Sequence, residues 1–350
     1  MRVSAGTDAP DSGALKALAL AAGLDAVGIA SAEPFESTRA DLEARRAAGL
    51  HAGMAFTYRK PEVSTDPGRA LPGARAIVVG ALAYPSEPGP SPADGGPYGR
   101  VAAYARDDRY EVLRDALRTV AATLKADGHR TRVVCDDNAL VDREAARRAG
   151  LGWYGKSANL LLPGRGSWFV LGSVITTAPL TPDAGDVADG CGTCRRCLDA
   201  CPTGAIVAPG IVDARRCLSW LLQQAGTFPL EHREALGDRI YGCDDCQEVC
   251  PPNRRAGEQA EPTGAPAWVA LHELLAASDE EILERHGRWY IAQREPRWVR
   301  RNALVALGNT APDDERTSAV LTGFEHGDDE LLAEHAAWAR RRVAARAGAR

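Results

Sequence analysis

Eight of the nine cysteines stand at spacings that bind iron–sulfur clusters. The segment 191–202 reads C-x2-C-x2-C-x3-C-P, the ligand pattern of bacterial two-cluster ferredoxins. The segment 243–251 repeats the end of this pattern, and Cys217 supplies its missing first cysteine from upstream. Three thiolates on a tight loop can bind three irons of one cubane. The fourth cysteine, followed by proline, starts a helix and points at the other cluster.

This geometry predicts two [4Fe–4S] clusters, each with cysteine ligands from both segments. The first cluster has the ligands Cys191, Cys194, Cys197 and Cys250. The second cluster has the ligands Cys201, Cys217, Cys243 and Cys246. A zinc ribbon would use only two C-x2-C pairs, a disulfide framework needs an oxidising compartment, and the C-x3-C-x2-C of a radical-SAM site is absent. The ninth cysteine, Cys135, is predicted to be a small buried hydrophobe.

Size and composition allow two or three domains and argue against several classes of protein. The chain has 350 residues, is 45% hydrophobic and carries a net charge of −5, so nothing global indicates nucleic-acid binding. We find no apolar run long enough to span a membrane and no signal peptide. Thiolate clusters suit a reducing compartment, so we expect a cytoplasmic protein that does not associate with membranes.

Residues 1–178 alternate strands with helices, which predicts an α/β or α+β domain. The predicted helices cover 12–24, 37–48, 109–126 and 140–149. The predicted strands cover 25–30, 76–84 and 132–135, followed by a hairpin with arms 159–162 and 167–176. A polar linker then leads into the ferredoxin-like module.

The ferredoxin-like module is assigned to 179–258, and an all-α domain to 259–350. In this tail Ser278 to Glu281 form a capping box, and short helices are expected at 298–307, 317–324 and 330–345. The stretch 301–309 is similar to the first helix of a HEAT-like repeat. From 285 to 350 there are 12 Arg and 9 acidic residues, so the tail presents either a solvated face or a surface for phosphates.

Two further features could carry chemistry. The glycine-rich turn 150–156 matches neither a Walker A loop nor a dinucleotide-binding fingerprint, so we expect its backbone to approach a large ligand. Asp136 and Asp137 stand where a strand ends, and a carboxyl there can donate a proton if its pKa is raised. The alternative is that one of the two caps the following helix. The seven histidines form no metal-binding pattern.

The chain resembles the epoxyqueuosine reductase family over nearly its whole length. The motifs that carry the resemblance are G-L-G-W-Y-G-K at 150–156, G-S-W-F-V-L-G at 166–172, the cysteine run with T-G-A-I at 203–206, V-D-A-R-R-C at 212–217, D-R-I-Y-G-C-D-D-C at 238–246 with V-C-P at 249–251, and R-N-A-L-V-A-L-G-N at 301–309. The resemblance implies that the N-terminal domain binds base-off cobalamin, and that two [4Fe–4S] clusters supply electrons to cob(I)alamin. It further implies reduction of epoxyqueuosine to queuosine at the wobble position of tRNA.

The resemblance also implies site residues and partners. The family's proton donor, an Asp at the start of a V-D-x-x-P-x-x-E-R run, corresponds to Asp136. The residues expected to contact cobalamin are Arg59, Asp136, Lys156, Ser157, Ser219, Gln224 and Asp244. The ferredoxin-like module and the helical tail would hold the tRNA anticodon stem-loop. We expect an external low-potential electron donor and a monomeric protein.

Three departures from the family pattern bear on these assignments. The donor motif reads C-D-D-N-A-L-V-D-R at 135–143, so Asp137 is a second candidate for the donor. The family's Y-A-R-G-x-D-Y-H ends in Glu111 here, and Gln224 replaces an acidic residue. Two other functions fit the cysteines: a cobalamin-dependent reductive dehalogenase, which would be exported, and a non-catalytic ferredoxin-type carrier, which leaves the first 178 residues without a role.

Overall fold

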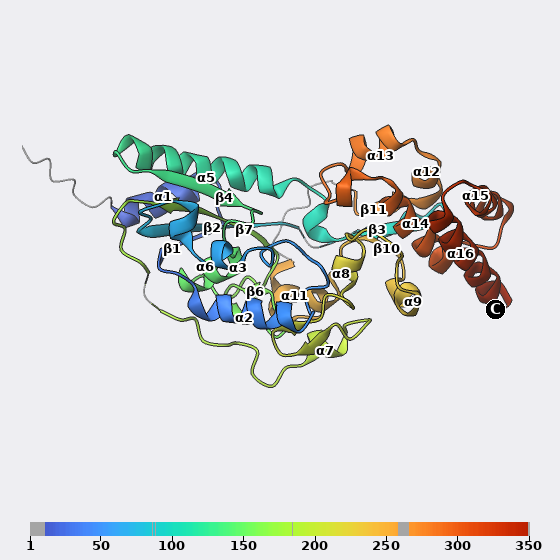
Figure 1. Ribbon diagram of the computed structural model, residues 1–350, viewed down its shortest axis with the longest axis horizontal. Helices are drawn as coiled ribbons and strands as arrows, with labels where there is room; N and C mark the ends of the chain where they lie inside the picture. The colour runs from blue at the N-terminus through green and yellow to red at the C-terminus, as the bar shows by residue number, and fades with distance from the viewer. Residues whose placement is uncertain (1–10, 86, 88, 184, 258–265, 349–350) are drawn as a thin grey trace, which may run out of the picture.

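The computed structural model describes residues 11–85, 87, 89–183, 185–257 and 266–348. In Figure 1 a helix-covered sheet lies at one end of the molecule and the C-terminal helices lie at the other. The cysteine-bearing segment 190–257, coloured yellow-green to yellow-orange, runs below and between them. Within these described ranges, no helix is both long and apolar enough to cross a membrane.

The N-terminal sheet has the strand order β1-β2-β7-β4, with every neighbouring pair antiparallel. Its strands are β1 (Ala26–Ser31), β2 (Ala76–Ala83), β7 (Phe169–Thr176) and β4 (Thr131–Cys135). β2 consists of apolar or small residues and is buried along nearly all its length, because both faces of the sheet are covered. The predicted mixture of strands and helices is confirmed, and the antiparallel order makes it the α+β kind.

Helices pack on both faces of this sheet. They are α1 (Ser12–Ala21), α2 (Glu36–Ala47), the short α3 (Pro61–Ser64) and α4 (Pro67–Ala70), α5 (Arg109–Ala126) and α6 (Asp142–Arg148). Alternate residues of β2 point to opposite sides, so Val78 joins the core beneath α1 and α5 while Val79 joins the core beneath α6. The close approach of α5 needs Gly172, where a Cβ would lie 2.8 Å from a methyl of Leu117. The predicted helices agree with these within a few residues.

The predicted hairpin between 159–162 and 167–176 is limited to one antiparallel bridge between Leu162 and Gly166, and its two arms do not pair along their length. Its second arm becomes β7, which pairs with β2 and β4. Its first arm supplies β6 (Leu160–Leu161), which pairs with β5 (Trp153–Tyr154). A buried apolar strand of eight residues needs long partners on both sides, and β2 and β4 provide them.

A second sheet takes one strand from each of the three predicted regions. Its order is β10-β3-β11, formed by β10 (Arg239–Tyr241), β3 (Tyr98–Val101) and β11 (Trp268–Ala270). β3 runs parallel to β10 and antiparallel to β11. The tail is therefore not all-α as predicted, since β11 lies within it. Three- and four-residue strands leave too short an alternation to be predicted from sequence.

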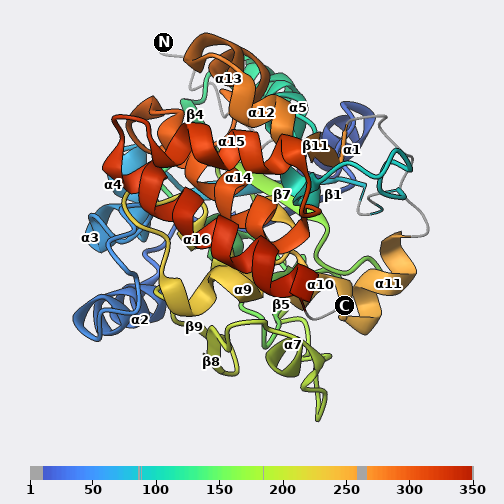
Figure 2. The same cartoon turned by 90° about the vertical axis from the view of Figure 1, so that its right-hand side faces the viewer.

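Short elements separate the cysteines. They are α7 (Arg196–Asp199), β8 (Ile206–Ala208), β9 (Ile211–Val212), α8 (Leu218–Leu221), α9 (Arg233–Leu236), α10 (Asp245–Glu248) and α11 (Pro251–Gly257). Beyond them lie α12 (Leu271–Ala276), α13 (Asp279–His286), α14 (Arg297–Thr310), α15 (Glu315–Glu325) and α16 (Glu330–Gly348). The capping box of Ser278 and Glu281 at the start of α13 is confirmed. Figure 2 shows α14, α15 and α16 stacked together.

Helix α14 is tied to the cysteine-bearing segment by buried polar side chains. Arg301 is fully buried, and its guanidinium donates to the carbonyl oxygens of Leu221, Gln224 and Gly226 at 3.0, 2.9 and 2.5 Å. Asn302 donates to the carbonyls of Leu222 and Ile240 at 2.8 and 3.2 Å. These bonds attach two segments to α14: the chain that follows Cys217, and the strand β10 that precedes Cys243.

Arg301→Met is expected to lower the free energy of unfolding of the apoprotein by at least about 3 kcal/mol, because it leaves several buried carbonyls without donors. Urea denaturation followed by circular dichroism measures this difference. The exposed Arg316 on α15 supplies the matched control, and Arg316→Met should change stability by less than about 0.5 kcal/mol. Equal effects of the two substitutions would contradict the bracing role of Arg301.

His335 on α16 makes the fold sensitive to acid. Its Nε2 accepts the Phe228 backbone N–H at 3.1 Å, and burial lowers the pKa of the imidazole to about 4. Between that value and the ordinary 6.5, the unfolded chain binds a proton that the folded chain does not. Stability therefore falls as the pH drops through this window, by about 2 kcal/mol from pH 7 to pH 5. Denaturation midpoints measured for His335→Gln should show a flatter pH profile.

Candidate active site and cluster-binding cysteines

Asp136 directly follows β4, where that strand leaves the sheet. Its φ of 52° lies in the left-handed region, which aspartate adopts more readily than most residues. Burial raises the pKa of its carboxyl, Arg114 lowers it, and the charge of Asp137 raises it again. The side chain is nevertheless exposed. Asp136 thus combines an accessible side chain with partly desolvated surroundings, and a raised pKa favours retention of a proton.

Asp142, the first residue of α6, is a second carboxyl beside Asp136. Burial raises its pKa well above the ordinary value, and the charges of Asp136 and Asp137 add to that shift. The backbone of Asp136 lowers the pKa of Asp142 slightly, so the two residues are neighbours. Sequence reasoning misses Asp142 as a site residue. The acidic residue of the family pattern at this position is the signal that could have found it.

Buried tyrosines extend from this carboxyl pair towards the cysteines. Burial raises the pKa of Tyr110 well above its ordinary value, and the charges of Asp136 and Asp142 contribute. Burial likewise raises the pKa of Tyr84, where Asp244 and Cys246 contribute, and raises the pKa of Tyr241 to about 12. The hydroxyl groups therefore stay protonated and can donate hydrogen bonds. Sequence reasoning misses these tyrosines too, since their positions become related only on folding.

Asp137, the second donor candidate, is engaged with its own loop. Its carboxylate accepts the Ala139 N–H at 2.8 Å and lies 3.8 Å from the Arg132 guanidinium. It therefore closes a turn and does not cap α6, whose N-cap is Val141. The neighbouring Asn138 accepts the Thr57 N–H at 2.8 Å. This bond fixes the loop 50–60 against the Asp136 loop.

The loop 50–60 carries Arg59, which is exposed. The same loop is bound to the segment around Cys217, because Trp220 donates from its indole N–H to the Ala52 carbonyl at 3.1 Å. The structure thus brings the Arg59 loop beside the Asp136 loop on one side and the α8 segment, which contains Ser219, on the other. On this loop the Nδ1 of His51 is buried without a hydrogen-bond partner among the described residues.

Lys156 contacts the first cysteine loop. Its ammonium donates to the carbonyl oxygens of Gly192 and Cys194 at 2.6 and 2.9 Å. The glycine-rich turn before it has a packing reason for one of its glycines, and its expected approach to a large ligand stays a prediction. A Cβ on Gly152 would lie 2.0 Å from the Leu161 carbonyl oxygen, so glycine is required there by the β5–β6 pair. Ser157 lies in the turn between these two strands.

Asp244 and Gln224 lie on the side of the cysteines that faces the tyrosines and α14. Asp244 is buried, accepts the Ala103 N–H at 2.7 Å, and has a pKa raised by burial to about 6. The backbone carbonyl of Gln224 accepts from Arg301. Ser219 thus lies within the short helix α8 and Gln224 follows it, while Asp244 stands between two cysteines of the predicted second cluster.

The eight motif cysteines are all free thiols, and seven of them, all but Cys243, are related to other cysteines by their charges. Burial raises the pKa of Cys250 to about 11, and the nearby thiols of Cys191, Cys197 and Cys194 contribute. Burial also raises the pKa of Cys246, where Cys217 and Cys201 contribute. Cys135, by contrast, is buried in the N-terminal core as predicted.

The donor set suits iron–sulfur clusters. Within the described ranges, no three or more His, Cys, Asp or Glu side chains close on a site for a single metal ion. A cubane spreads its thiolates around four irons, so its ligands stand farther apart than those of one ion. The Ala205 N–H points at the Cys201 sulfur at 3.1 Å, and hydrogen bonds of this kind tune cluster potentials.

Two family models match the chain. One is described as "Epoxyqueuosine reductase QueG, DUF1730" and matches residues 65–137, a range that ends at the Asp136–Asp137 pair. The other is described as "4Fe-4S double cluster binding domain" and matches residues 190–253, a range that contains all eight motif cysteines.

Individual proteins are similar over nearly the whole chain. The epoxyqueuosine reductase of Bacillus cereus is 35% identical over 331 residues, which cover 91% of this chain and 85% of the relative. A structure of epoxyqueuosine reductase from Bacillus subtilis, with its aspartate catalytic loop swung out of the active site, has a TM-score of 0.85 at 34% identity and covers 95% of this chain and 90% of that chain. An epoxyqueuosine reductase solved with an epoxyqueuosine-modified tyrosine tRNA stem loop has a TM-score of 0.85 at 34% identity, with 95% and 89% covered.

Proposed function

Because this chain belongs to the epoxyqueuosine reductase family, we propose that it reduces epoxyqueuosine to queuosine at the wobble position of tRNA. It is an oxidoreductase of queuosine biosynthesis. The observation that carries the proposal is the similarity over nearly the whole chain, which includes both the Asp136 loop and the cysteine runs. The reaction consumes two electrons and two protons, and the epoxide oxygen leaves as water.

The electrons come through two [4Fe–4S] clusters. The proximity of Cys191, Cys194, Cys197 and Cys250 supports their assignment to the first cluster. The proximity of Cys201, Cys217 and Cys246 supports the second, for which Cys243 is the fourth ligand. Lys156 positions the first cysteine loop through its two carbonyl contacts.

We place a cobalamin, bound without its own base, beside Asp136, where the Arg59 loop contacts both the Asp136 loop and the α8 segment. Such a cofactor supplies the low-potential chemistry that opens the epoxide. The orphaned Nδ1 of His51 supports a ligand at this place, since a buried polar atom without a partner is costly. The residues that would hold the group are Arg59, Asp136, Ser157, Ser219, Gln224 and Asp244.

Asp136 is the proton donor in this proposal. Its raised pKa favours a proton on an accessible carboxyl, and it can pass that proton to the epoxide oxygen as negative charge develops there. The neighbouring Asp142 has a pKa raised by burial and by the charge of Asp136. Asp137 is less suited, because its carboxylate is occupied by the turn to Ala139. The solved relative with an aspartate catalytic loop supports an aspartate in this role.

The remaining partners follow the same family comparison. The relative solved with a modified stem loop supports tRNA as the substrate, and in this proposal the ferredoxin-like module and the HEAT-like helical tail hold the anticodon stem-loop. The protein acts as a monomer and receives low-potential electrons from an external donor.

Expression of this chain in Escherichia coli cells that lack their own epoxyqueuosine reductase tests the proposal. The expected result is tRNA that contains queuosine, whereas the parent cells accumulate epoxyqueuosine. Cells that express well-folded protein with both clusters and still accumulate only epoxyqueuosine would contradict the proposed substrate.

A further inference from the structure

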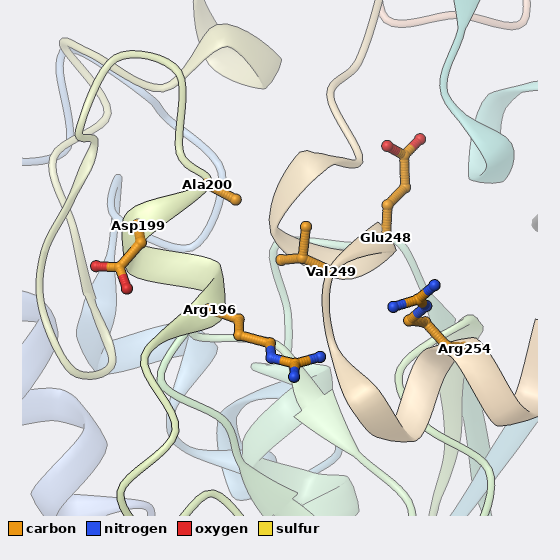
Figure 3. A pocket seen from close by; sticks show the side chains of 6 residues that line it. All are labelled: Arg196, Asp199, Ala200, Glu248, Val249 and Arg254. Atoms are coloured by element: carbon orange, nitrogen blue, oxygen red, sulfur yellow. The ribbon is translucent and has the colours of Figure 1, made fainter.

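A cavity of about 540 Å³ lies between α7 and the turn from α10 to α11. Figure 3 shows the six residues that line it: Arg196, Asp199, Ala200, Glu248, Val249 and Arg254. None of them belongs to the set proposed for the cofactor or the proton donor. The cavity is therefore a surface feature that the proposed chemistry leaves without a role.

The cavity adjoins two cysteines of the proposed first cluster, and Ala200 brings it next to Cys201 of the second group as well. Arg196 immediately precedes Cys197, and Val249 immediately precedes Cys250. Both cysteines belong to the first group, and Cys197 lies close enough to Cys250 to raise the pKa of its thiol. A molecule seated in the cavity would thus contact the chain on both sides of that cluster.

The two acidic side chains at the cavity lie beside arginines outside it, so the charge that remains unpaired there is positive. Glu248 is paired with Arg100 at 2.7 Å, and Asp199 lies 3.8 Å from Arg195. Arg196 and Arg254 are exposed and form no ion pair with another described residue. In Figure 3 both guanidinium groups extend towards the space between the two segments, whereas Asp199 points away from it.

The two clusters differ in their surroundings. The neighbours of Cys191, Cys194 and Cys197 are exposed: Gly192, Thr193, Arg195, Arg196 and Asp199. Most neighbours of the second group are buried, although Pro202 and Arg216 are exposed; the buried ones are Thr203, Ala205, Leu218, Gly242, Asp244 and Gln247. Cys246 of the second group faces the N-terminal domain, with Asn159 at 4.0 Å from its sulfur. The first group is therefore the better placed of the two to receive electrons from outside.

We propose that this cavity is the docking site of a small acidic electron-transfer protein of the flavodoxin type, which reduces the first cluster. Carboxylates of the carrier pair with Arg196 and Arg254. The flavin hydroquinone loses one electron and becomes a semiquinone, and the oxidised cluster gains that electron without any bond being made or broken. The proposal rests on the proposed function, which requires low-potential electrons.

A protein fits this surface better than an RNA does. Asp199 and Glu248 stand at the same rim as the two arginines, so the rim carries both signs of charge and is not the uniformly basic surface that a polyanionic backbone favours. A protein partner can present basic groups to the acids and carboxylates to the arginines.

Anaerobic stopped-flow reduction of the clusters by flavodoxin hydroquinone, without tRNA, tests the proposal. At low salt the rate constant for the double variant Arg196→Glu, Arg254→Glu should fall at least about tenfold, because electrostatic steering is reversed. The corresponding double Gln variant should show a smaller loss. Arg316→Glu with Arg341→Glu, exposed on α15 and α16, is the matched control and should keep the wild-type rate.

Dithionite separates docking from cluster damage and from the enzyme's own reaction. The Glu double variant should keep its iron content and its rate of reduction by dithionite. If flavodoxin reduced the Glu double variant as fast as the wild type, the proposal would be overturned. It would also be overturned if the variant lost only its binding of tRNA, because the cavity would then be a contact for RNA. Wild-type protein that is reduced normally yet converts no epoxyqueuosine with dithionite would instead refute the proposed function alone.

Discussion

Asp136→Asn is expected to abolish turnover of tRNA that carries epoxyqueuosine, while both clusters remain. Asparagine keeps the size of the side chain and tolerates the left-handed backbone of this position, but its amide cannot supply the proton. A positioned general acid contributes about 10²–10⁴-fold to a rate, so the single-turnover rate should fall by at least about 100-fold. Rapid quench with mass spectrometry of the nucleosides measures it.

Asp137→Asn is the matched control for this substitution. Its amide oxygen can still accept the Ala139 N–H, so the turn and the activity should both persist. If Asp137→Asn were inactive and Asp136→Asn active, the donor role would pass to Asp137. Iron content and visible absorption of both variants should equal those of the wild type.

Cys246→Ala is expected to remove the second cluster. The iron content should fall from about eight to about four per chain, since a [4Fe–4S] cluster normally has four cysteine ligands. Cys246 lies on the side of the cysteines that faces the tyrosines and Asp136, so the electron route to the site is broken there. Turnover should be lost, while dithionite still produces the electron paramagnetic resonance signal of one reduced cluster.

The ninth cysteine gives an internal control for the cluster assignment. Cys135 is buried in the N-terminal core and lies outside both cysteine groups. Cys135→Ala should therefore keep about eight irons per chain and most of the activity. A Cys246→Ala protein with the full iron content would contradict the placement of Cys246 in a cluster.

Local signals explain which elements could be predicted. Helix α5 covers the predicted range 109–126 because its apolar residues follow a helical period and Asp108 caps its first turn. β2 and β4 are short apolar runs that must be buried wherever they pair. The partner of β7 could not be predicted in this way, since β2 lies more than 80 residues upstream. The segment 159–162 precedes β7 by only a few residues, so a hairpin between these two segments was the simpler prediction.

The same distinction between local and long-range signals applies to the residues of the site. The cysteine spacing is local, so their grouping could be proposed from sequence. Asp136 was found through the family pattern, whereas its raised pKa arises from surroundings that only folding creates. Lys156 stands in a family motif, yet its contacts with Gly192 and Cys194 depend on how the first cysteine loop folds back over the β5–β6 turn. The tyrosines and Asp142 have no local signature.

The most direct test of the proposed function is the anaerobic conversion of epoxyqueuosine tRNA by the purified protein. The protein is reconstituted with iron and sulfide, reduced with dithionite, and incubated with the tRNA in the presence or absence of cobalamin. We expect the modified nucleoside to lose the mass of one oxygen only when cobalamin is present. No loss of oxygen from a protein that holds about eight irons and one corrinoid would contradict the proposal.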